Sequence, residues 1–282
     1  MMKIIRDIPS LRDQVRRWRH DGETVGLIPT MGSLHEGHLA LVRQAKQDCD
    51  HAIATIFVNP TQFAPSEDFD TYPRDETRDI DMLNGLETDL LFSPNVDEMY
   101  AKGFSTSVAV SNITQCLCGA ARPHFFGGVV TVVSKLLLQA LPDRAYFGEK
   151  DFQQLQVIKR MARDLDIPVD IQGVSTIREA DGMAMSSRNK YLSANQRKIG
   201  ATLYQVLQDI ATRLTAGEHA DAVLLDGAAT LKAAGFDPID YLEIRDSETF
   251  EPLETNNGTA RIFAAAFLGE TRLIDNIAVR AV

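Results

Sequence analysis

The sequence lacks the signatures of several common protein classes. Its 282 residues include only three cysteines, and Cys116 and Cys118 are too close together for a C-x-x-C metal or redox site. No segment carries the G-x-x-x-x-G-K-[ST], G-x-G-x-x-G or G-x-S-x-G pattern, so a P-loop and a hydrolase nucleophile elbow are excluded. Because the cysteines form no such metal or redox site, we expect buried, reduced thiols at Cys49, Cys116 and Cys118.

Positive charge and long apolar runs are also scarce. The formal net charge of −10 argues against a general nucleic-acid binder, which would carry a basic stripe. The most apolar stretch, residues 129–138, is interrupted by Thr, Ser and Lys and is shorter than the ~20 residues that span a bilayer. The first residues lack the architecture of a signal peptide. We expect a cytoplasmic protein that binds neither nucleic acid nor membranes.

The first part of the chain alternates strand-like and helix-like segments. Strands are expected at 3–5, 24–28, 52–58, 89–92 and from 145, and helices at 10–20, 36–48, 75–85, 128–141 and 152–165. Ser10 and Asp13 are expected to cap the first helix. Apolar strands separated by helices are typical of a parallel, Rossmann-like α/β sheet with helices on both faces. We assign residues 1–176 to this domain.

The pattern changes after about residue 173. Ser193 and Gln196 form a capping box that predicts a long helix to about Leu214, and a second helix is expected over 220–234. Three later segments, at 239–245, 260–267 and 272–279, resemble antiparallel strands. Residues 177–282 are therefore predicted to form a smaller α+β domain.

One segment, residues 59–74, fits neither pattern. It holds three prolines and shows no periodicity, and unstructured loops of this length are usually functional or disordered. Its aromatic residues Phe63, Phe69 and Tyr72 favour a segment that packs on itself or closes over a ligand.

A short string directly after the apolar run 25–28 is the first candidate site. Its residues are Met31, Gly32, Ser33, Leu34, His35, Glu36, Gly37 and His38. A strand end followed by glycine and a helix start presents free N–H groups to an anion, and imidazoles add donors. This H-x-G-H pattern favours contact with nucleotide phosphates. A pair of surface or capping histidines and a zinc site remain alternatives, although nearby metal-type ligands are missing.

Two further strings are rich in phosphate ligands. The first, after the run 145–147, is Gly148, Glu149, Lys150 and Asp151, and the second includes Met185, Ser186, Ser187 and Arg188. Arginine binds phosphate in a bidentate manner, and serine hydroxyls suit phosphate oxygens. An exposed lysine paired with its acidic neighbours and an ordinary polar turn are the alternatives. Three such strings together favour phosphate chemistry.

At these positions the chain resembles the pantothenate synthetase (pantoate–β-alanine ligase) family of the nucleotidyltransferase superfamily. The matching strings, in the order and spacing of the family, are residues 29–38, 58–63 with 72–74, 147–154 and 181–189. The resemblance implies a two-step ligation. Pantoate attacks the α-phosphate of ATP to form pantoyl adenylate and pyrophosphate, and β-alanine then releases AMP and pantothenate.

The resemblance also implies roles for individual residues. Residues 31–38 would line the ATP site, with His38 as proton donor and with His35, Lys150 and Arg188 also catalytic. Gly148 to Asp151, Ile177 and Met185 to Arg188 would complete it. Gln62 and Gln154 would hold pantoate, and Gln62 would also lie near β-alanine. The family requires Mg²⁺ and usually forms a homodimer.

In one segment the chain departs from the family pattern. The family commonly has Arg-Pro-Gly-His-Phe where this sequence has Arg-Pro-His-Phe-Phe at 122–126, so no role is assigned to His124. Elsewhere the residue types suit the chemistry. Lys150, Arg188, the two imidazoles and Mg²⁺ would offset the charge of the triphosphate. The amides of Gln62 and Gln154 could orient the carboxylate without neutralising it.

Two other functions compete with this interpretation. A nucleotidyltransferase that leaves the nucleotide in its product shares the H-x-G-H pattern, but it would not explain the two glutamines or the 181–189 string. A non-catalytic nucleotide sensor is the second alternative. Release of AMP would separate the ligase from the transferase, and turnover would exclude the sensor.

Overall fold

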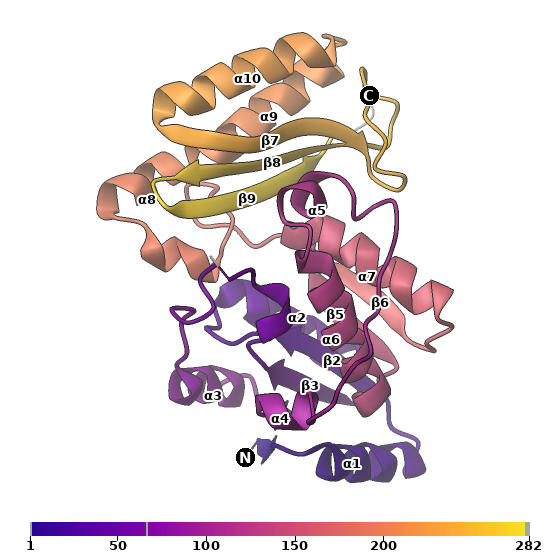
Figure 1. Cartoon of the computed structure of the whole chain (residues 1–282). Helices are drawn as coiled ribbons and strands as arrows, with labels where there is room; N and C mark the ends of the chain where they lie inside the picture. The colour runs from indigo at the N-terminus through magenta and orange to yellow at the C-terminus, as the bar shows by residue number, and fades with distance from the viewer. Residues whose placement is uncertain (1, 66, 280–282) are drawn as a thin grey trace. The chain divides into compact units, whose positions relative to one another are not determined.

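The computed structural model describes residues 2–65 and 67–279. The chain divides into two compact units, and neither is continuous in sequence (Figure 1). The first comprises Met1–Thr114, Arg122–Glu149 and Gln153–Ser175, and the second comprises Gln115–Ala121, Lys150–Phe152 and Thr176–Val282. The predicted domains, 1–176 and 177–282, are continuous segments, so that division stays a prediction.

The first unit is built on a six-stranded parallel sheet with the order β1-β4-β3-β2-β5-β6. The strands are β1 (Lys3–Ile5), β2 (Val25–Thr30), β3 (His51–Ile56), β4 (Leu90–Phe92), β5 (Arg144–Gly148) and β6 (Asp170–Val174). The central strands are nearly continuous buried apolar runs, as expected where both faces of a parallel sheet are covered. The Rossmann-like α/β prediction is therefore confirmed.

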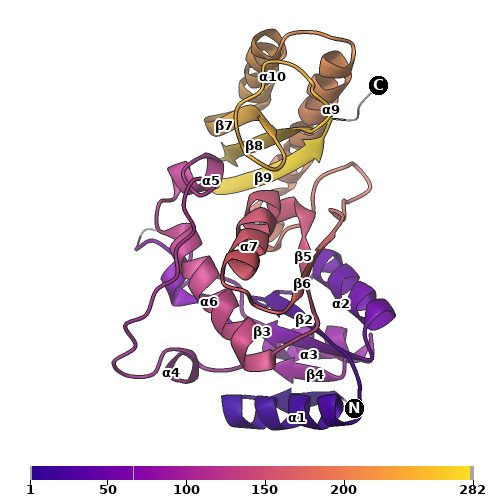
Figure 2. The same ribbon diagram turned by 90° about the vertical axis from the view of Figure 1, so that its right-hand side faces the viewer.

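Helices cover both faces of this sheet. They are α1 (Ile8–His20), α2 (Glu36–Asp48), α3 (Glu76–Asn84), α6 (Phe125–Ala140) and α7 (Phe152–Asp164), with a short α4 (Val96–Met99). Right-handed crossovers from β2 to β3 and from β3 to β4 place α2 and α3 on one face. The crossovers into β2, β5 and β6 run the opposite way, so α1, α6 and α7 lie on the other face (Figure 2).

The chain reverses its direction of winding between β2 and β5, which are adjacent in the sheet. Helix α2 leads from β2 toward one edge, and α7 leads from β5 toward the other. Such a switch point opens a crevice beyond the carboxyl ends of the strands, where ligands of open α/β sheets bind. Residues 31–35 and Gly148 lie at these two strand ends.

In the first unit one expectation is wrong and one strand was missed. Helix α1 starts at Ile8, and its N-cap is Asp7, whose carboxylate accepts a hydrogen bond from Ser10 N at 2.9 Å. A proline in the first turn suits this earlier start, which the predicted capping by Ser10 and Asp13 overlooked. Strand β6 was not predicted, because this edge strand is only partly buried and lacks an apolar run.

The second unit contains an antiparallel sheet with the order β7-β8-β9, covered by helices (Figure 1). Its elements are α5 (Leu117–Ala121), α8 (Ala194–Gly200), α9 (Thr202–Thr215), α10 (Ala220–Ala234), β7 (Phe236–Asp246), β8 (Ala260–Leu268) and β9 (Thr271–Ala278). Its core includes Leu207, Ile210, Val223, Phe236 and Ile262. The smaller α+β architecture is confirmed.

The predicted long helix of this unit is divided in two. The Ser193–Gln196 capping box is present and starts α8, but the helix is interrupted after Gly200. A Cβ at Gly200 would lie 2.9 Å from the sulfur of Met183, so the backbone approaches its neighbour closely there. Helical periodicity alone does not reveal this close packing.

The cysteines are free thiols, but only Cys118 is buried, whereas Cys49 and Cys116 are half-buried. The prediction of three buried thiols is therefore wrong for two of them. Cys49 is the C-cap residue of α2 and Cys116 directly precedes α5, so both lie at helix ends where their side chains stay partly exposed. None of the helices within residues 2–65 and 67–279 combines the length and the apolar composition of a membrane span.

Candidate active site

The two histidines of the H-x-G-H string cap helix α2. His35 is the N-cap residue, and its Nδ1 accepts a hydrogen bond from Gly37 N at 3.1 Å. His38 Nδ1 accepts one from His35 N at 3.4 Å, so the two imidazoles form a reciprocal capping box. Their ring centroids are 4.1 Å apart. Because each Nδ1 is an acceptor, a neutral ring carries its proton on Nε2.

The turn before these histidines is held in a left-handed conformation. Gly32 has φ 80° and Ser33 has φ 51°, and the latter is unusual for a residue with a side chain. A Cβ on Gly32 would lie 3.0 Å from Asp79 Oδ2, so the glycine is needed for space as well as for its φ. Strain of this kind persists only where the surroundings hold it in place.

Asp79 of α3 supplies that support. Its side chain is 1% exposed, and its carboxylate accepts hydrogen bonds from Ser33 N at 2.7 Å and Leu34 N at 2.8 Å. The sequence interpretation missed this residue. The available signal was an acidic residue on the apolar face of a helix, four positions before the buried Leu83.

Gln62, a predicted substrate ligand, lies in a short 3₁₀ helix, Pro60–Gln62, which follows β3 after residues 57–59. Its amide is 8% exposed, donates a hydrogen bond to Met31 Sδ at 2.7 Å and accepts one from Asn59 Nδ2 at 3.1 Å. The structure therefore brings together Met31 and Gln62, which were predicted to bind different substrates. Asn59 is another functional candidate that the sequence interpretation left without a role.

Asn59 connects this turn to two other segments. Its side chain is 1% exposed, donates to the Gly128 carbonyl at 3.2 Å and accepts from the Tyr100 hydroxyl at 2.9 Å. Burial raises the pKa of Tyr100, so this hydroxyl remains a donor. Helix α6 comes so close that a Cβ on Gly128 would lie 2.4 Å from the Thr61 carbonyl oxygen.

The loop that follows Gln62 packs on itself. Phe63 contacts Phe69 and Tyr72 edge-on, with ring centroids 5.5 Å and 5.9 Å apart. The Arg74 guanidinium lies 5.1 Å from the Phe69 ring centre, and it donates to three loop carbonyls. Ser66 lies outside the described residues. Closure of this loop over a ligand stays a prediction.

Other predicted residues of the first unit lie at the end of β5 and the start of α7. Gly148 ends the strand, and Glu149 follows it. Gln154 is half-buried in the first turn of α7. Its neighbour Gln153 is buried and donates to the Ile113 carbonyl at 2.8 Å, so of the two adjacent glutamines Gln154 is the one with side-chain surface accessible to a substrate.

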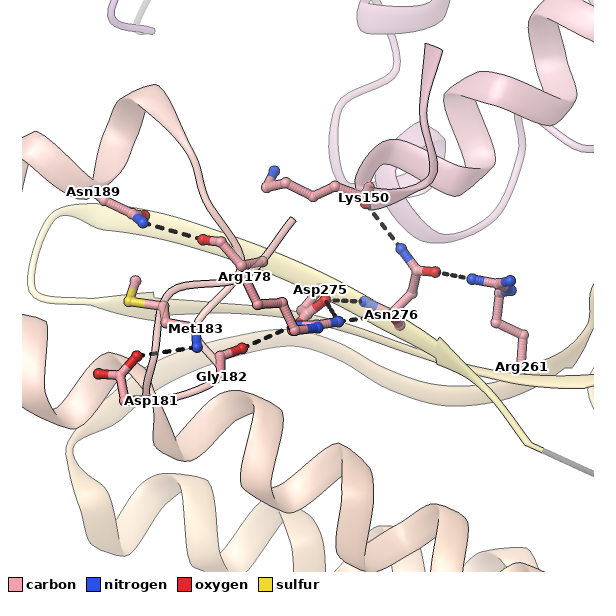
Figure 3. Close-up of polar contacts among 10 residues, drawn as sticks. Lys150, Arg178, Asp181, Gly182, Met183, Asn189, Arg261, Asp275 and Asn276 are labelled. Carbon is pink, nitrogen blue, oxygen red and sulfur yellow. Dashed lines mark hydrogen bonds and ion pairs between the residues drawn. The ribbon is translucent and has the colours of Figure 1, made fainter. Parts of the chain in front are cut away.

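The second unit holds Lys150, Asp151 and the Ile177–Arg188 residues. Figure 3 shows Lys150 and the hairpin residues Arg178 and Asp181 to Met183. The Lys150 side chain is 18% exposed, and its Nζ lies 3.8 Å from Asp151 Oδ2. This burial does not fit an ordinary exposed lysine. A tight hairpin brings Ile177 to Met185, whose N–H donates to the Ile177 carbonyl at 3.0 Å.

The residues after this hairpin form a compact polar turn. Ser186 is the N-cap of the 3₁₀ helix Ser187–Tyr191, and its hydroxyl accepts from Arg188 N at 3.3 Å. At the hairpin tip, a hydrogen bond from Arg197 is the main factor that lowers the pKa of Asp181. This carboxylate also accepts from Met183 N at 3.2 Å, which helps to fix the tip.

The zinc alternative lacks its ligands in this structure. Across residues 2–65 and 67–279, no group of three or more His, Cys, Asp or Glu side chains is placed to hold a metal ion. The capping alternative for His35 and His38 correctly describes their local role. The capping hydrogen bonds use only Nδ1 of each ring, and both histidines also make further interactions.

Comparison with known proteins agrees with the motifs. The model of the pantoate-beta-alanine ligase family matches residues 3–278. A pantothenate synthetase from Paramagnetospirillum magneticum is 54% identical over 98% of this chain and 97% of its own length. One from Caulobacter vibrioides is 52% identical over 98% of each chain.

Solved structures give the same result. Pantothenate synthetase from Thermus thermophilus aligns with a TM-score of 0.94 and 46% identity, over 99% of this chain and 100% of that one. A pantoate-β-alanine ligase from Francisella tularensis, solved with "Beta-gamma ATP" and β-alanine, gives a TM-score of 0.84 at 33% identity, over 99% and 98% of the two chains. With the family model and these relatives in agreement over nearly its whole length, the chain belongs to the pantoate–β-alanine ligase family.

Proposed function

We propose that this chain is an AMP-forming acid–amino-acid ligase that condenses pantoate with β-alanine in pantothenate biosynthesis. The observation that carries the proposal is the family match over residues 3–278. Pantoate attacks the α-phosphate of ATP to give pantoyl adenylate and pyrophosphate. β-Alanine then attacks the acyl carbon and releases AMP, so no covalent bond to the enzyme is required.

ATP is the nucleotide substrate, and we propose its ligands from the three strings. The helix start at His35 offers free N–H groups and the positive end of a dipole, which favour phosphate oxygens. The proposed ligands are Met31, Gly32, Ser33, Leu34, His35, Glu36, Gly37, His38, Gly148, Glu149, Lys150, Asp151, Ile177, Met185, Ser186, Ser187 and Arg188. Residues 1–176 would form the ATP- and pantoate-binding domain, and 177–282 the smaller C-terminal domain.

The acidic substrate and the amine would be bound by amides. We propose Gln62 and Gln154 for pantoate and Gln62 for β-alanine. The side chain of Gln62 is fixed by Met31 and Asn59, so it presents a preorganised amide. An amide orients the attacking carboxylate by hydrogen bonding without neutralising it, and the carboxylate therefore stays nucleophilic.

Charge shifts toward the departing pyrophosphate during the first step, and His38, His35, Lys150 and Arg188 are proposed to stabilise it. The capping box uses Nδ1 of both imidazoles, so His38 Nε2 carries the proton that would be donated. Lys150 and Arg188 add full positive charges, which are most effective where they are partly shielded from water.

Mg²⁺ is proposed to arrive with the nucleotide. The described residues offer no cage of three acidic, histidine or cysteine side chains, so the donor set does not fit an ion held by the protein alone. Mg²⁺ commonly binds through substrate phosphates and water with one or two carboxylates. We further propose a cytoplasmic homodimer, as the family resemblance implies, which sedimentation can test.

Incubation with ATP, pantoate and β-alanine tests the function directly. The ligase predicts equal amounts of AMP, pyrophosphate and pantothenate. A product that retains AMP would instead indicate the nucleotidyltransferase alternative, and ATP binding without turnover would indicate the sensor. Omitting pantoate is the matched control, since it should abolish pyrophosphate release.

A further inference from the structure

A buried amide on β9 holds the backbone of Lys150. Asn276 is 4% exposed, and its Nδ2 donates a hydrogen bond to the Lys150 carbonyl oxygen at 2.9 Å (Figure 3). The two residues are 126 positions apart in the sequence. Lys150 itself lies in a single 3₁₀ turn, Glu149–Asp151, which has little internal rigidity. The Asn276 hydrogen bond therefore adds outside support to the backbone of this turn.

The orientation of the Asn276 amide is fixed by its neighbours. Its Oδ1 accepts a hydrogen bond from an Nη of Arg261, and arginine has no acceptor to offer. Nδ2 must consequently face Lys150, whose carbonyl is only an acceptor. The Arg261 guanidinium is held in turn, because it lies 3.7 Å from the centre of the Phe152 ring.

The same strand also anchors the hairpin that leads to Arg188. Asp275 is 3% exposed, and it binds Arg178 with both oxygens at 2.6 Å and 2.9 Å. Arg178 also donates to the Gly182 carbonyl at 3.1 Å and stacks 3.8 Å from the Tyr204 ring centre. Arg178 thus ties the base of the hairpin to β9 and also holds the hairpin tip through Gly182 (Figure 3).

Adjacent strand residues point to opposite faces of a sheet. Asn276 is paired with Phe263, which contacts the Phe152 ring, and Asp275 is paired with Ala264 on the other face. Strand β9 pairs with β8 along its whole length, from Thr271 to Ala278. A rigid strand therefore serves as the common support for the Lys150 turn and for the hairpin.

We propose that Asn276 is a positioning residue for the adenylation step: its amide keeps Lys150 in register with the hairpin that Asp275 anchors to the same strand. The inference rests on the proposed function, in which Lys150 contacts phosphate. Displacement of a charged donor by about 1 Å can lower a rate by two orders of magnitude. The effect is confined to the step in which pyrophosphate departs.

The test is pantoate-dependent exchange of labelled pyrophosphate into ATP by Asn276→Asp. The carboxylate keeps the shape and the Arg261 contact, but it places an acceptor against the Lys150 carbonyl. We expect kcat for exchange to fall tenfold to hundredfold, while amide formation from supplied pantoyl adenylate changes less than about threefold. Asn276→Ser, whose hydroxyl is too short for this bond, serves as a second variant if the first fails to fold. Leu273→Ala, in the core side of the same strand, controls for general destabilisation.

A double-mutant cycle separates positioning from a structural effect. In the Lys150→Ala background, Asn276→Asp should reduce exchange by less than about twofold, because the group through which it acts is gone. A full tenfold loss in that background, or equal losses in both half-reactions, would overturn the inference. Wild-type enzyme without pantoate-dependent exchange would instead contradict the proposed function itself, so the two failures are distinguishable.

Discussion

The close approach of α6 to the turn that holds Gln62 can be tested with two neighbouring glycines. A Cβ at Gly128 would lie 2.4 Å from Thr61 O and 2.6 Å from Gln62 Cα. Both are backbone atoms, and the contact is about 1 Å shorter than van der Waals packing allows. At Gly127, the adjacent residue on the same helix, an added Cβ meets nothing within 4 Å.

The two alanine substitutions should therefore change the free energy of unfolding in opposite directions. Gly127→Ala gains about 0.5–1 kcal/mol from helix propensity. Gly128→Ala gains the same, but overpacking costs about 1–3 kcal/mol and the weakened Asn59 hydrogen bond to the Gly128 carbonyl about 1 kcal/mol more. A net loss of about 1–3 kcal/mol lowers Tm by roughly 2–4 °C per kcal/mol.

The KM values should also distinguish Gly128→Ala from Gly127→Ala. In Gly128→Ala, α6 displaces the Gln62 turn, and we expect KM for pantoate and for β-alanine to rise at least about tenfold, since a misplaced binding group loses about 1.4 kcal/mol or more. Gly127→Ala should keep wild-type kinetics. Thermal melting and steady-state turnover measure both effects. If Gly128→Ala matches Gly127→Ala in Tm and in KM, the inferred crowding at this contact is wrong.

Further substitutions test the site residues and the Asp246 carboxylate of the second unit. Asp79→Asn puts an NH₂ group against a backbone N–H of the Ser33 turn, so we expect it to lower the free energy of unfolding in urea by about 2–3 kcal/mol and to remove most of the activity. The control is Asp75→Asn at the N-cap of the same helix, which should cost less than ~0.5 kcal/mol. Equal effects of the two substitutions would contradict the role of Asp79. Lys150→Ala and His38→Ala should each slow adenylation ~10²–10³-fold, and near-normal exchange would refute their roles. Tm should change little in Lys150→Ala, whereas His38→Ala also loses its capping contact with His35 N, which is worth about 1 kcal/mol. Hydrogen bonds from Thr249 N and from Thr259 lower the pKa of Asp246 in the folded protein. The ionised carboxylate therefore stabilises the fold at pH values above the ordinary pKa of 3.8. This contribution is lost as the pH falls through the lower pKa of the folded state. The stability lost in Asp246→Asn should accordingly be smaller at pH 3 than at pH 7, and a pH-independent difference would argue against the shift.

Local signals in the sequence predicted the elements that carry the site. Helix α2 begins and ends at the predicted residues, 36 and 48, because its capping string and its apolar period agree. Helix α10 likewise matches its predicted range, 220–234. The strand-end position of the H-x-G-H string followed from the alternation of apolar runs and helices alone.

Supports that come from distant residues could not be predicted in this way. Asp79 reaches a turn 45 residues earlier, and Asn276 reaches Lys150 across 126 residues. Neither contact leaves a periodic pattern or a local motif. The close approach of Gly200 to Met183 is likewise a contact between segments that lie apart in the sequence. Sequence patterns thus indicated the groups proposed for chemistry, and the structure added the groups that hold them.

The most direct test of the account is isotope exchange between pyrophosphate and ATP. Because adenylation precedes attack by the amine, wild-type enzyme should exchange labelled pyrophosphate into ATP when pantoate is present and β-alanine is absent. Exchange should vanish without pantoate. A requirement for β-alanine, with no exchange when pantoate and ATP alone are supplied, would contradict a pantoyl-adenylate intermediate formed in a separate first step.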